Sequence, residues 1–185
     1  MRAVVMQGSY GVFPTENLSL SMPAIQTCIG LYGEDANARR LVCAHFDTEK
    51  QLNHNMSKIL TAIHHSGMQA GSTRIKLFGG DGRLSLLRCT PPSTYIGMRI
   101  IDALKAAGFS KIEYTRHYSG LFAQTFNYEY RNGVSVVVPV FSEESFPFLG
   151  IHSAVYQRAR SRIQKRPDQY TAQDAVMDDI TQYYR

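Results

Sequence analysis

The chain has 185 residues, of which 44% are hydrophobic and 11% aromatic, and its formal net charge is +5. This composition favours one folded domain with a substantial core and argues against a disordered chain. No apolar run approaches the roughly 20 residues that a transmembrane helix needs, and the first residues, MRAVVMQGSYG, do not resemble a standard signal peptide. The three cysteines have no framework spacing, which indicates reduced thiols in a cytosol.

The N-terminal half predicts strands around one helix. The strands are 3–6, 24–33, 41–46 and 73–78, a loop lies between the prolines at 14 and 23, and the helix covers 53–67. Segment 24–33, AIQTCIGLYG, reads as a buried strand or as a strand-to-helix passage. Apolar residues recur at helical spacing within 53–67, and Gly67 supplies the stop.

The C-terminal half predicts a second helix, three strands and a basic extension. The helix is 91–109, ended by Gly108, and the strands are 111–115, 121–130 and 133–141, with the hairpin turn RNG between the last two. Residues 1–150 are expected to form the main domain. Residues 151–185 are expected to form a basic, helical extension packed on or beside it, with Thr171 as a helix cap. This order of elements predicts a mixed α/β layer structure with antiparallel strand pairs.

The basic run YQRARSRIQKR, residues 156–166, could bind nucleic acid, an anionic membrane or an acidic protein face. It lacks interleaved aromatic residues of the kind that stack on bases. A solvated basic face is the simpler interpretation, so we expect neither nucleic-acid binding nor membrane insertion, and we expect a monomer.

Known cofactor motifs are absent from the sequence. It has no phosphate-binding Gly-Lys-Ser/Thr loop, no dinucleotide fingerprint and no His-Glu-x-x-His helix. Cys43 and His45 would share one strand face near His54, His64 and His65, but no Cys-x-x-Cys pair supports zinc, and adjacent histidines project about 100° apart on a helix. We therefore expect neither a metal nor a cofactor.

Cys28 and His45 form the candidate catalytic pair. A cysteine alone is most often buried and inert, and a single strand histidine is most often structural. Here the cysteine ends an apolar segment and the histidine lies on the next strand beyond a polar turn, so sulfur and imidazole can meet. The imidazole would then favour the thiolate, which makes Cys28 a candidate nucleophile and His45 its base.

Four strings carry a family resemblance: QTCIGLYG, LVCAHF, KLFGG and YIGMRIIDALKAAGFSKIEYTRHYSG. The cysteine follows the small hydroxyl residue Thr27, and the histidine lies 45 − 28 = 17 residues further on. In this order and spacing, over about residues 20–140, the chain resembles the CheD family of chemoreceptor glutamine deamidases. That family shares its catalytic core with toxins of the cytotoxic necrotising factor type.

The resemblance implies an α/β protein with two packed mixed β-sheets flanked by helices and a metal-free Cys28–His45 site. It implies a cysteine-dependent protein-glutamine deamidase that releases ammonia from a protein substrate. The substrate would be a chemoreceptor in the bacterial cytoplasm, or a host protein if the chain is delivered as an effector. Two alternatives share the same residues: a transglutaminase, and an inactive docking or regulatory protein.

The chain also departs from the family pattern. Gln26 and Thr27 stand where the family has Gly-Ser, and the threonine that the family has six residues before its cysteine falls on Met22. Ser21 and Thr27 are therefore candidates for an orienting or oxyanion-binding role, although a backbone carbonyl could also orient His45. The turn FGGDG, with Gly79 and Gly80, is expected to let backbone approach a ligand or another segment closely, and it is the candidate substrate-approach loop.

Overall fold

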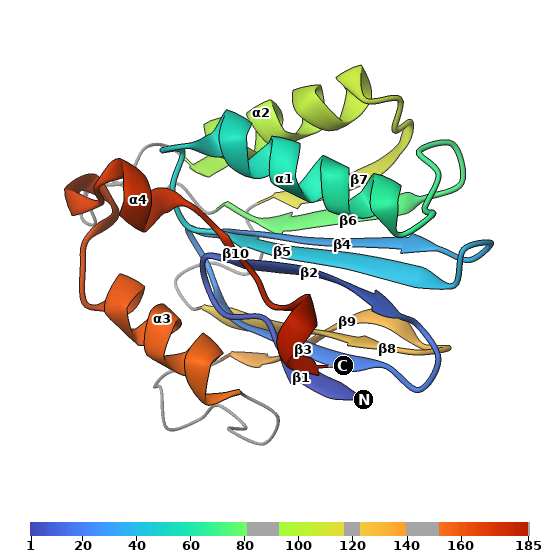
Figure 1. The fold of residues 1–185 in the computed structure, drawn as a ribbon, viewed down its shortest axis with the longest axis horizontal. Coiled ribbons are helices and arrows are strands. Elements are labelled where there is room, and N and C mark those ends of the chain that lie inside the picture. Colours follow the sequence, from blue (N-terminus) through green and yellow to red (C-terminus); the bar gives the residue numbers. More distant parts are fainter. Residues whose placement is uncertain (81–92, 117–122, 140–151, 185) are drawn as a thin grey trace.

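The computed structural model describes residues 1–80, 93–116, 123–139 and 152–184 (Figure 1). Its strands are β1 Arg2–Val4, β2 Ser9–Pro14, β3 Ser19–Ile25, β4 Ile29–Asp35, β5 Arg40–Phe46, β6 Arg74–Gly79, β7 Lys111–Arg116, β8 Gln124–Glu129, β9 Gly133–Pro139 and β10 Asp178–Asp179. Its α-helices are α1 Leu52–His65, α2 Ser93–Ala106, α3 Ser153–Ile163 and α4 Ala172–Ala175, and its short 3-10 helices are η3 Pro167–Gln169 and η4 Thr181–Tyr184.

The strands form two mixed sheets that lie one above the other in Figure 1. One sheet has the order β1-β3-β8-β9, and the other has the order β10-β2-β5-β4-β6-β7. The pairs β1–β3, β10–β2 and β6–β7 are parallel, and the other neighbouring strands are antiparallel. The predicted α/β fold with two packed mixed sheets flanked by helices is confirmed.

Two apolar cores hold these layers together. The helices α1 and α2 cover the outer face of the six-stranded sheet (Figure 1), and the buried side chains there include Ile29, Leu31, Val42, Ile59, Leu77, Ile100 and Leu104. The second core lies between the sheets and includes Phe13, Leu20, Met22, Tyr32, Cys43, Phe78 and Phe126. Because both faces of the six-stranded sheet are covered, its central strands β4 and β5 are buried almost throughout.

Both predicted helices are present, and each ends before the glycine that was expected to stop it. The helix α1 buries Met56, Ile59 and Ile63 at helical spacing, and Gly67 follows it with φ +82°. Gly108 follows α2 with φ +94°. Glycine adopts this left-handed conformation without a Cβ penalty, which is why each stop signal was readable from sequence.

The predicted loop between positions 14 and 23 is only partly present, because the turn that joins β2 and β3 is limited to residues 15–18. Residues 19–23 belong to β3, and the prolines are tolerated because Pro14 ends β2 and Pro23 lies within the register shift between Met22 and Ile25. At that irregularity Ala24 has φ 61°. The predicted continuous segment 24–33 is therefore divided into the end of β3, a bend at residues 26–28, and β4.

The C-terminal segment packs against the rest of the chain. It runs through α3, η3 and α4 and then adds β10 to the edge of the six-stranded sheet, parallel to β2. Thr171 caps α4 as predicted, since its hydroxyl accepts a hydrogen bond from Asp174 N at 3.1 Å. No helix in the described parts of the chain is long and apolar enough to cross a bilayer.

Several sequence predictions fall partly outside the described residues. They are the turn FGGDG beyond Gly80, the start of the 91–109 helix, the first two residues of the 121–130 strand, the last two of the 133–141 strand, and the domain boundary at 150.

Candidate functional site

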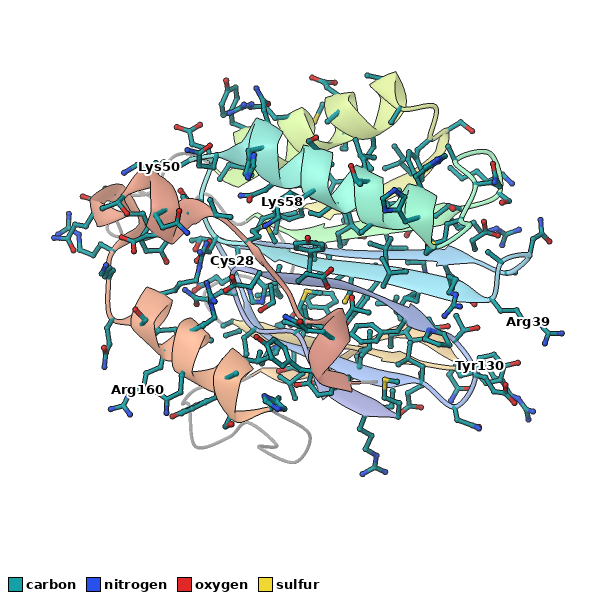
Figure 2. All side chains as sticks on the ribbon, in the orientation of Figure 1. Cys28, Arg39, Lys50, Lys58, Tyr130 and Arg160 are labelled. Atoms are coloured by element: carbon teal, nitrogen blue, oxygen red, sulfur yellow. The ribbon has the colours of Figure 1, made fainter. Side chains whose placement is uncertain are left out.

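Cys28 lies in the bend that joins the two sheets. Ile25 ends β3 in one sheet, Ile29 begins β4 in the other, and Gln26 and Thr27 between them are buried. Cys28 is only partly buried and packs against the core between the sheets. Figure 2 shows it at one end of the sheets, between α3 and α4. The bend therefore presents a thiol at the rim of the core.

The glycines of the predicted approach loop contact this bend. Gly79 and Gly80 have φ +91° and +77°, and Gly80 N donates a hydrogen bond to the Cys28 carbonyl oxygen at 2.9 Å. A Cβ on Gly79 would lie 2.4 Å from that same oxygen. The close approach inferred from these glycines is thus to the backbone of Cys28, and it fixes the position of the bend.

His45 projects from β5 toward the same core. It is 2% exposed, and it lies opposite Gly30 in the register of β4 and β5. Cys28 precedes Gly30 by two residues, and alternation along an extended chain returns positions two apart to one face. Cys28 directly precedes Ile29, which opens β4 opposite Phe46, and its side chain packs against the inter-sheet core. The structure therefore brings Cys28 and His45 to one region of the inter-sheet face.

The hydrogen bonding of His45 defines its tautomer. Nδ1 lies 3.1 Å from the Val5 carbonyl oxygen, which can only accept, so Nδ1 carries the proton and donates it. Nε2 is then the basic nitrogen, and it is buried without a hydrogen-bond partner among the described residues. A backbone carbonyl thus orients the ring. The sequence had left open whether a backbone carbonyl or a hydroxyl side chain has this role.

Burial determines the charge state of His45. It lowers the pKa of His45 to about 4, against the opposing effects of the Val5 hydrogen bond and the Asp47 carboxylate, and Arg162 lowers that pKa further. The imidazole is therefore neutral at pH 7 and available as a proton acceptor. Cys43, on the same strand, is 0% exposed, and burial raises the pKa of its thiol well above the ordinary value, so it is unreactive.

A buried polar cluster borders this pair, and sequence reasoning missed it. Asp47 forms an ion pair with Arg162 of α3, with Oδ1 2.5 Å from Nη2 and Oδ2 3.0 Å from Nε. Tyr170 donates to Asp47 Oδ2 at 2.8 Å, and Gln7 Nε2 donates to the same oxygen at 3.2 Å. Tyr170 also interacts electrostatically with Cys28, so the thiol lies within electrostatic range of this cluster.

The only sequence signal for this cluster was weak. Asp47 stands two residues after His45 and so shares its face of the chain, whereas Arg162 was one member of a basic run. Within that run Arg162 is 7% exposed. Three of its neighbours pair with nearby acidic side chains: Arg158 with Asp178, Lys165 with Asp174, and Arg166 with Asp168. These three pairs lie within the C-terminal segment, whereas Arg162 joins that segment to Asp47.

The remaining predicted site residues lie apart from His45 or carry no defined role. On β3 the buried side chains of Leu20 and Met22 face the inter-sheet core, so Ser21 between them faces away and lines a surface depression with Asn127. Ser21 is therefore not an orienting group for His45. Thr27 is buried in the bend beside Cys28, and its role in binding an oxyanion stays a prediction.

The histidines on α1 do not assemble a metal centre with Cys43 and His45. Those two side chains face the core between the sheets, whereas α1 covers the opposite face of the six-stranded sheet. The structure contains no group of three or more histidine, cysteine or acidic side chains placed to hold a metal ion within the ranges that it describes.

Fold and site define a two-sheet α/β protein with a cysteine and a histidine on the inter-sheet face, beside a buried ion pair. No family model matches the chain, and no curated protein sequence matches it. Among solved structures it is similar to the hypothetical protein YfiH of Bacillus licheniformis, with 13% identity, a TM-score of 0.44, and coverage of 58% of this chain and 50% of that chain. It is also similar to protein NMB0706 of Neisseria meningitidis, assigned to the family model DUF152, with 12% identity, a TM-score of 0.43, and coverage of 61% and 62%.

These comparisons overturn the resemblance to the CheD family. The two similar structures named above are a YfiH protein and a DUF152 protein, neither CheD nor toxin deamidases, and no family model matches the chain. The assignment as a protein-glutamine deamidase, with its chemotaxis, effector and toxin settings, is therefore wrong. The string KLFGG carried much of that resemblance, but it has a structural explanation. It is a buried strand that ends in two glycines because the backbone after β6 passes close to Cys28.

Proposed function

We propose that this protein is a thiol-dependent enzyme of acyl hydrolysis or acyl transfer, with Cys28 as nucleophile and His45 as the group that accepts and returns the proton. The proposal is carried by one observation. The Val5 carbonyl holds His45 in the tautomer that leaves Nε2 bare, on the sheet face where Cys28 also lies. A nucleophile beside an oriented neutral base is the minimal arrangement for this chemistry.

The reaction follows from these two groups. Cys28 Sγ attacks a carbonyl carbon while its proton passes to His45 Nε2, which produces a tetrahedral oxyanion and an imidazolium. The imidazolium then protonates the leaving alcohol or amine as the carbon–heteroatom bond breaks, which leaves a thioester on Cys28. Water, or a second nucleophile, attacks the thioester with His45 as base, and the acyl group departs as an acid or a transferred acyl product.

The buried imidazole constrains the starting state. Because burial lowers the pKa of His45 to about 4, the resting imidazole is neutral, and His45 starts the reaction as a proton acceptor. In the resting structure Nε2 lacks a hydrogen-bond partner among the described residues. The approach of Sγ to Nε2 must therefore tighten when substrate binds, as catalytic hydrogen bonds of unliganded enzymes often do.

The test uses p-nitrophenyl acetate, a generic activated ester. Wild-type protein is expected to release nitrophenol with an initial burst and to gain one acetyl group, which peptide mapping places on Cys28. Cys28→Ala should abolish both signals, whereas Cys43→Ala changes a buried thiol and is the matched control. A burst that survives Cys28→Ala, or a Cys28 that reacts only after the protein is unfolded, would show that Cys28 is a packing residue.

A further inference from the structure

The C-terminal segment inserts one charged side chain into the region of the proposed site. Arg162 of α3 reaches the Asp47 carboxylate and makes two hydrogen bonds to it. Its other terminal nitrogen, Nη1, donates to the carbonyl oxygens of Asp174 and Val176. The guanidinium is thereby fixed between the end of β5 and the segment around α4, with almost no exposed surface.

The opposing backbone makes room for this arginine. Gly8 has φ +77°, and a Cβ there would lie 2.1 Å from Arg162 Nε. The same residue ties the segment to the site, because Gly8 N donates to the His45 carbonyl oxygen at 2.8 Å and Gly8 O accepts from Asp178 N at 2.9 Å. Arg162, His45 and β10 therefore converge on one glycine.

We propose that the Asp47–Arg162 pair is a positioning device for the cysteine–histidine site, in which two opposite buried charges set the protonation of His45 and the nucleophilicity of Cys28. The inference rests on the proposed function and extends it, because it makes the C-terminal segment part of the site. Asp47 and Arg162 are positioning residues, since they act through His45 and Cys28 and have no contact with the reacting carbonyl.

The Asp47–Arg162 pair supplies the charges that act on His45. Asp47 lies on the same strand, Arg162 comes from α3, Tyr170 comes from the segment before α4, and Cys28 comes from the bend before β4. Tyr170 is uncharged at neutral pH, because burial and the adjacent Asp47 raise its pKa far above the ordinary value. Among the described residues, the charges that act on His45 are therefore those of Asp47 and Arg162, with opposite signs.

The two single variants should act in opposite directions. Asp47→Asn leaves the cation of Arg162, which favours the Cys28 thiolate and disfavours the imidazolium of His45. Arg162→Gln leaves the anion of Asp47, which disfavours the thiolate and favours the imidazolium. A buried charge near a titratable group typically shifts the pKa of that group by about one unit or more, so the rate of Cys28 alkylation below the thiol pKa should rise or fall about tenfold.

The experiment measures the pH profile of iodoacetamide alkylation at Cys28, by peptide mapping, in wild type and both variants. The double variant Asp47→Asn/Arg162→Gln removes both charges together and should return toward the wild-type profile. Arg160→Gln removes an exposed cation from the same helix and should leave the profile unchanged. Rates that change in the same direction in both single variants would mean a purely structural pair and would overturn the inference.

A second readout separates this inference from the proposed function. NMR follows the protonation of His45 as the pH is varied. The midpoint of this protonation should lie at lower pH in Asp47→Asn and at higher pH in Arg162→Gln than in wild type. If the Cys28 burst is absent but His45 shifts with these signs, the enzyme proposal fails and the charge device stands. If the burst is present and His45 does not shift, the charge device fails. Should Arg162→Gln fail to fold, Asp47→Asn should still raise the rate of Cys28 alkylation, and the double variant should return that rate toward the wild-type value; no rise in Asp47→Asn would overturn the inference.

Discussion

Gly80 N donates its hydrogen to the carbonyl oxygen of Cys28 across 2.9 Å, so the turn after β6 and the bend before β4 are joined directly. Gly79, one residue earlier, sits so close to that oxygen that no side chain fits between them. The position of the proposed nucleophile is thus determined by two glycines that follow it by about fifty residues. Changes at this contact should alter stability in a measurable way.

Gly79→Ala should lower the free energy of unfolding by more than about 2 kcal/mol. The left-handed conformation alone costs roughly 1–2 kcal/mol for a residue with a Cβ, and here the Cβ would also overlap the Cys28 carbonyl oxygen. Urea unfolding measures the loss. Gly67→Ala is the matched control, because Gly67 has φ +82° with no atom within 4 Å of the added Cβ, so it should lose only the conformational part. Equal losses of unfolding free energy at Gly79 and Gly67 would contradict the close contact between Gly79 and the Cys28 carbonyl oxygen.

His45 should make stability depend on pH between about 6.5 and 4. Its pKa is 6.5 when unfolded and about 4 when folded, so the unfolded chain takes up the proton first. Its effect on stability is therefore absent above pH 6.5 and grows as the pH falls toward 4, reaching about 3 kcal/mol of destabilisation. Urea unfolding at several pH values should show this slope in wild type.

The matched variants for that slope are His45→Asn and His54→Asn. His45→Asn should be less stable at pH 7, since it disturbs a buried ring, but its stability should fall less between pH 6.5 and 4. His54 is exposed on α1, so His54→Asn should keep the wild-type slope. A slope that persists unchanged in His45→Asn would assign the effect to other groups.

Asp35 should be a major determinant of stability at the far end of the sheet. It is 0% exposed, and its carboxylate accepts hydrogen bonds from Asn37 N, Ala38 N, Gln69 N and Ser72 Oγ. Burial would raise the pKa of Asp35, but these hydrogen bonds lower it overall. Its stabilisation is therefore present above the unfolded pKa of 3.8 and is lost as the pH falls through the lower folded value.

Asp35→Asn turns an NH₂ group toward N–H and O–H donors that need an acceptor. The substitution should lower the free energy of unfolding by about 2–3 kcal/mol at pH 7. Asp102→Asn on the exposed face of α2 should cost little. Both are measured by urea unfolding at pH 7. A small loss at Asp35 would mean that the loops at 36–38 and 69–72 hold each other without the carboxylate.

Ala24→Gly should stabilise the protein by up to about 1 kcal/mol. Ala24 has φ 61° at the irregularity of β3, and glycine adopts this conformation without the Cβ penalty. The control is Ala103→Gly within α2, where the same substitution should destabilise by about 1 kcal/mol because the helix favours alanine. Thermal unfolding shows whether each variant is more or less stable than wild type. A destabilised Ala24→Gly would contradict the inferred backbone strain at Ala24.

Local patterning determined much of the fold. The helices around Met56 and Ile100, the glycine stops, the Thr171 cap and the hairpin after Glu129 follow from side-chain periodicity and backbone preference, which act over a few residues. The same patterning failed at β2 and β3. Proline there indicates a loop by local preference, whereas pairing with β5 and β8 supplies the hydrogen bonds that make strands stable.

For the site, the sequence by itself determined that Cys28 and His45 stand at a distance that lets neighbouring strands bring them together. Only the tertiary structure decided that Val5 orients the imidazole, that Ser21 faces away, and that Arg162 meets Asp47 across 115 residues of chain. A short string such as KLFGG reflects a local backbone requirement that is not specific to one family, and for this reason the family assignment was wrong. The reason is that spacing encodes local geometry, while burial, charge and tautomer depend on which distant segments pack together.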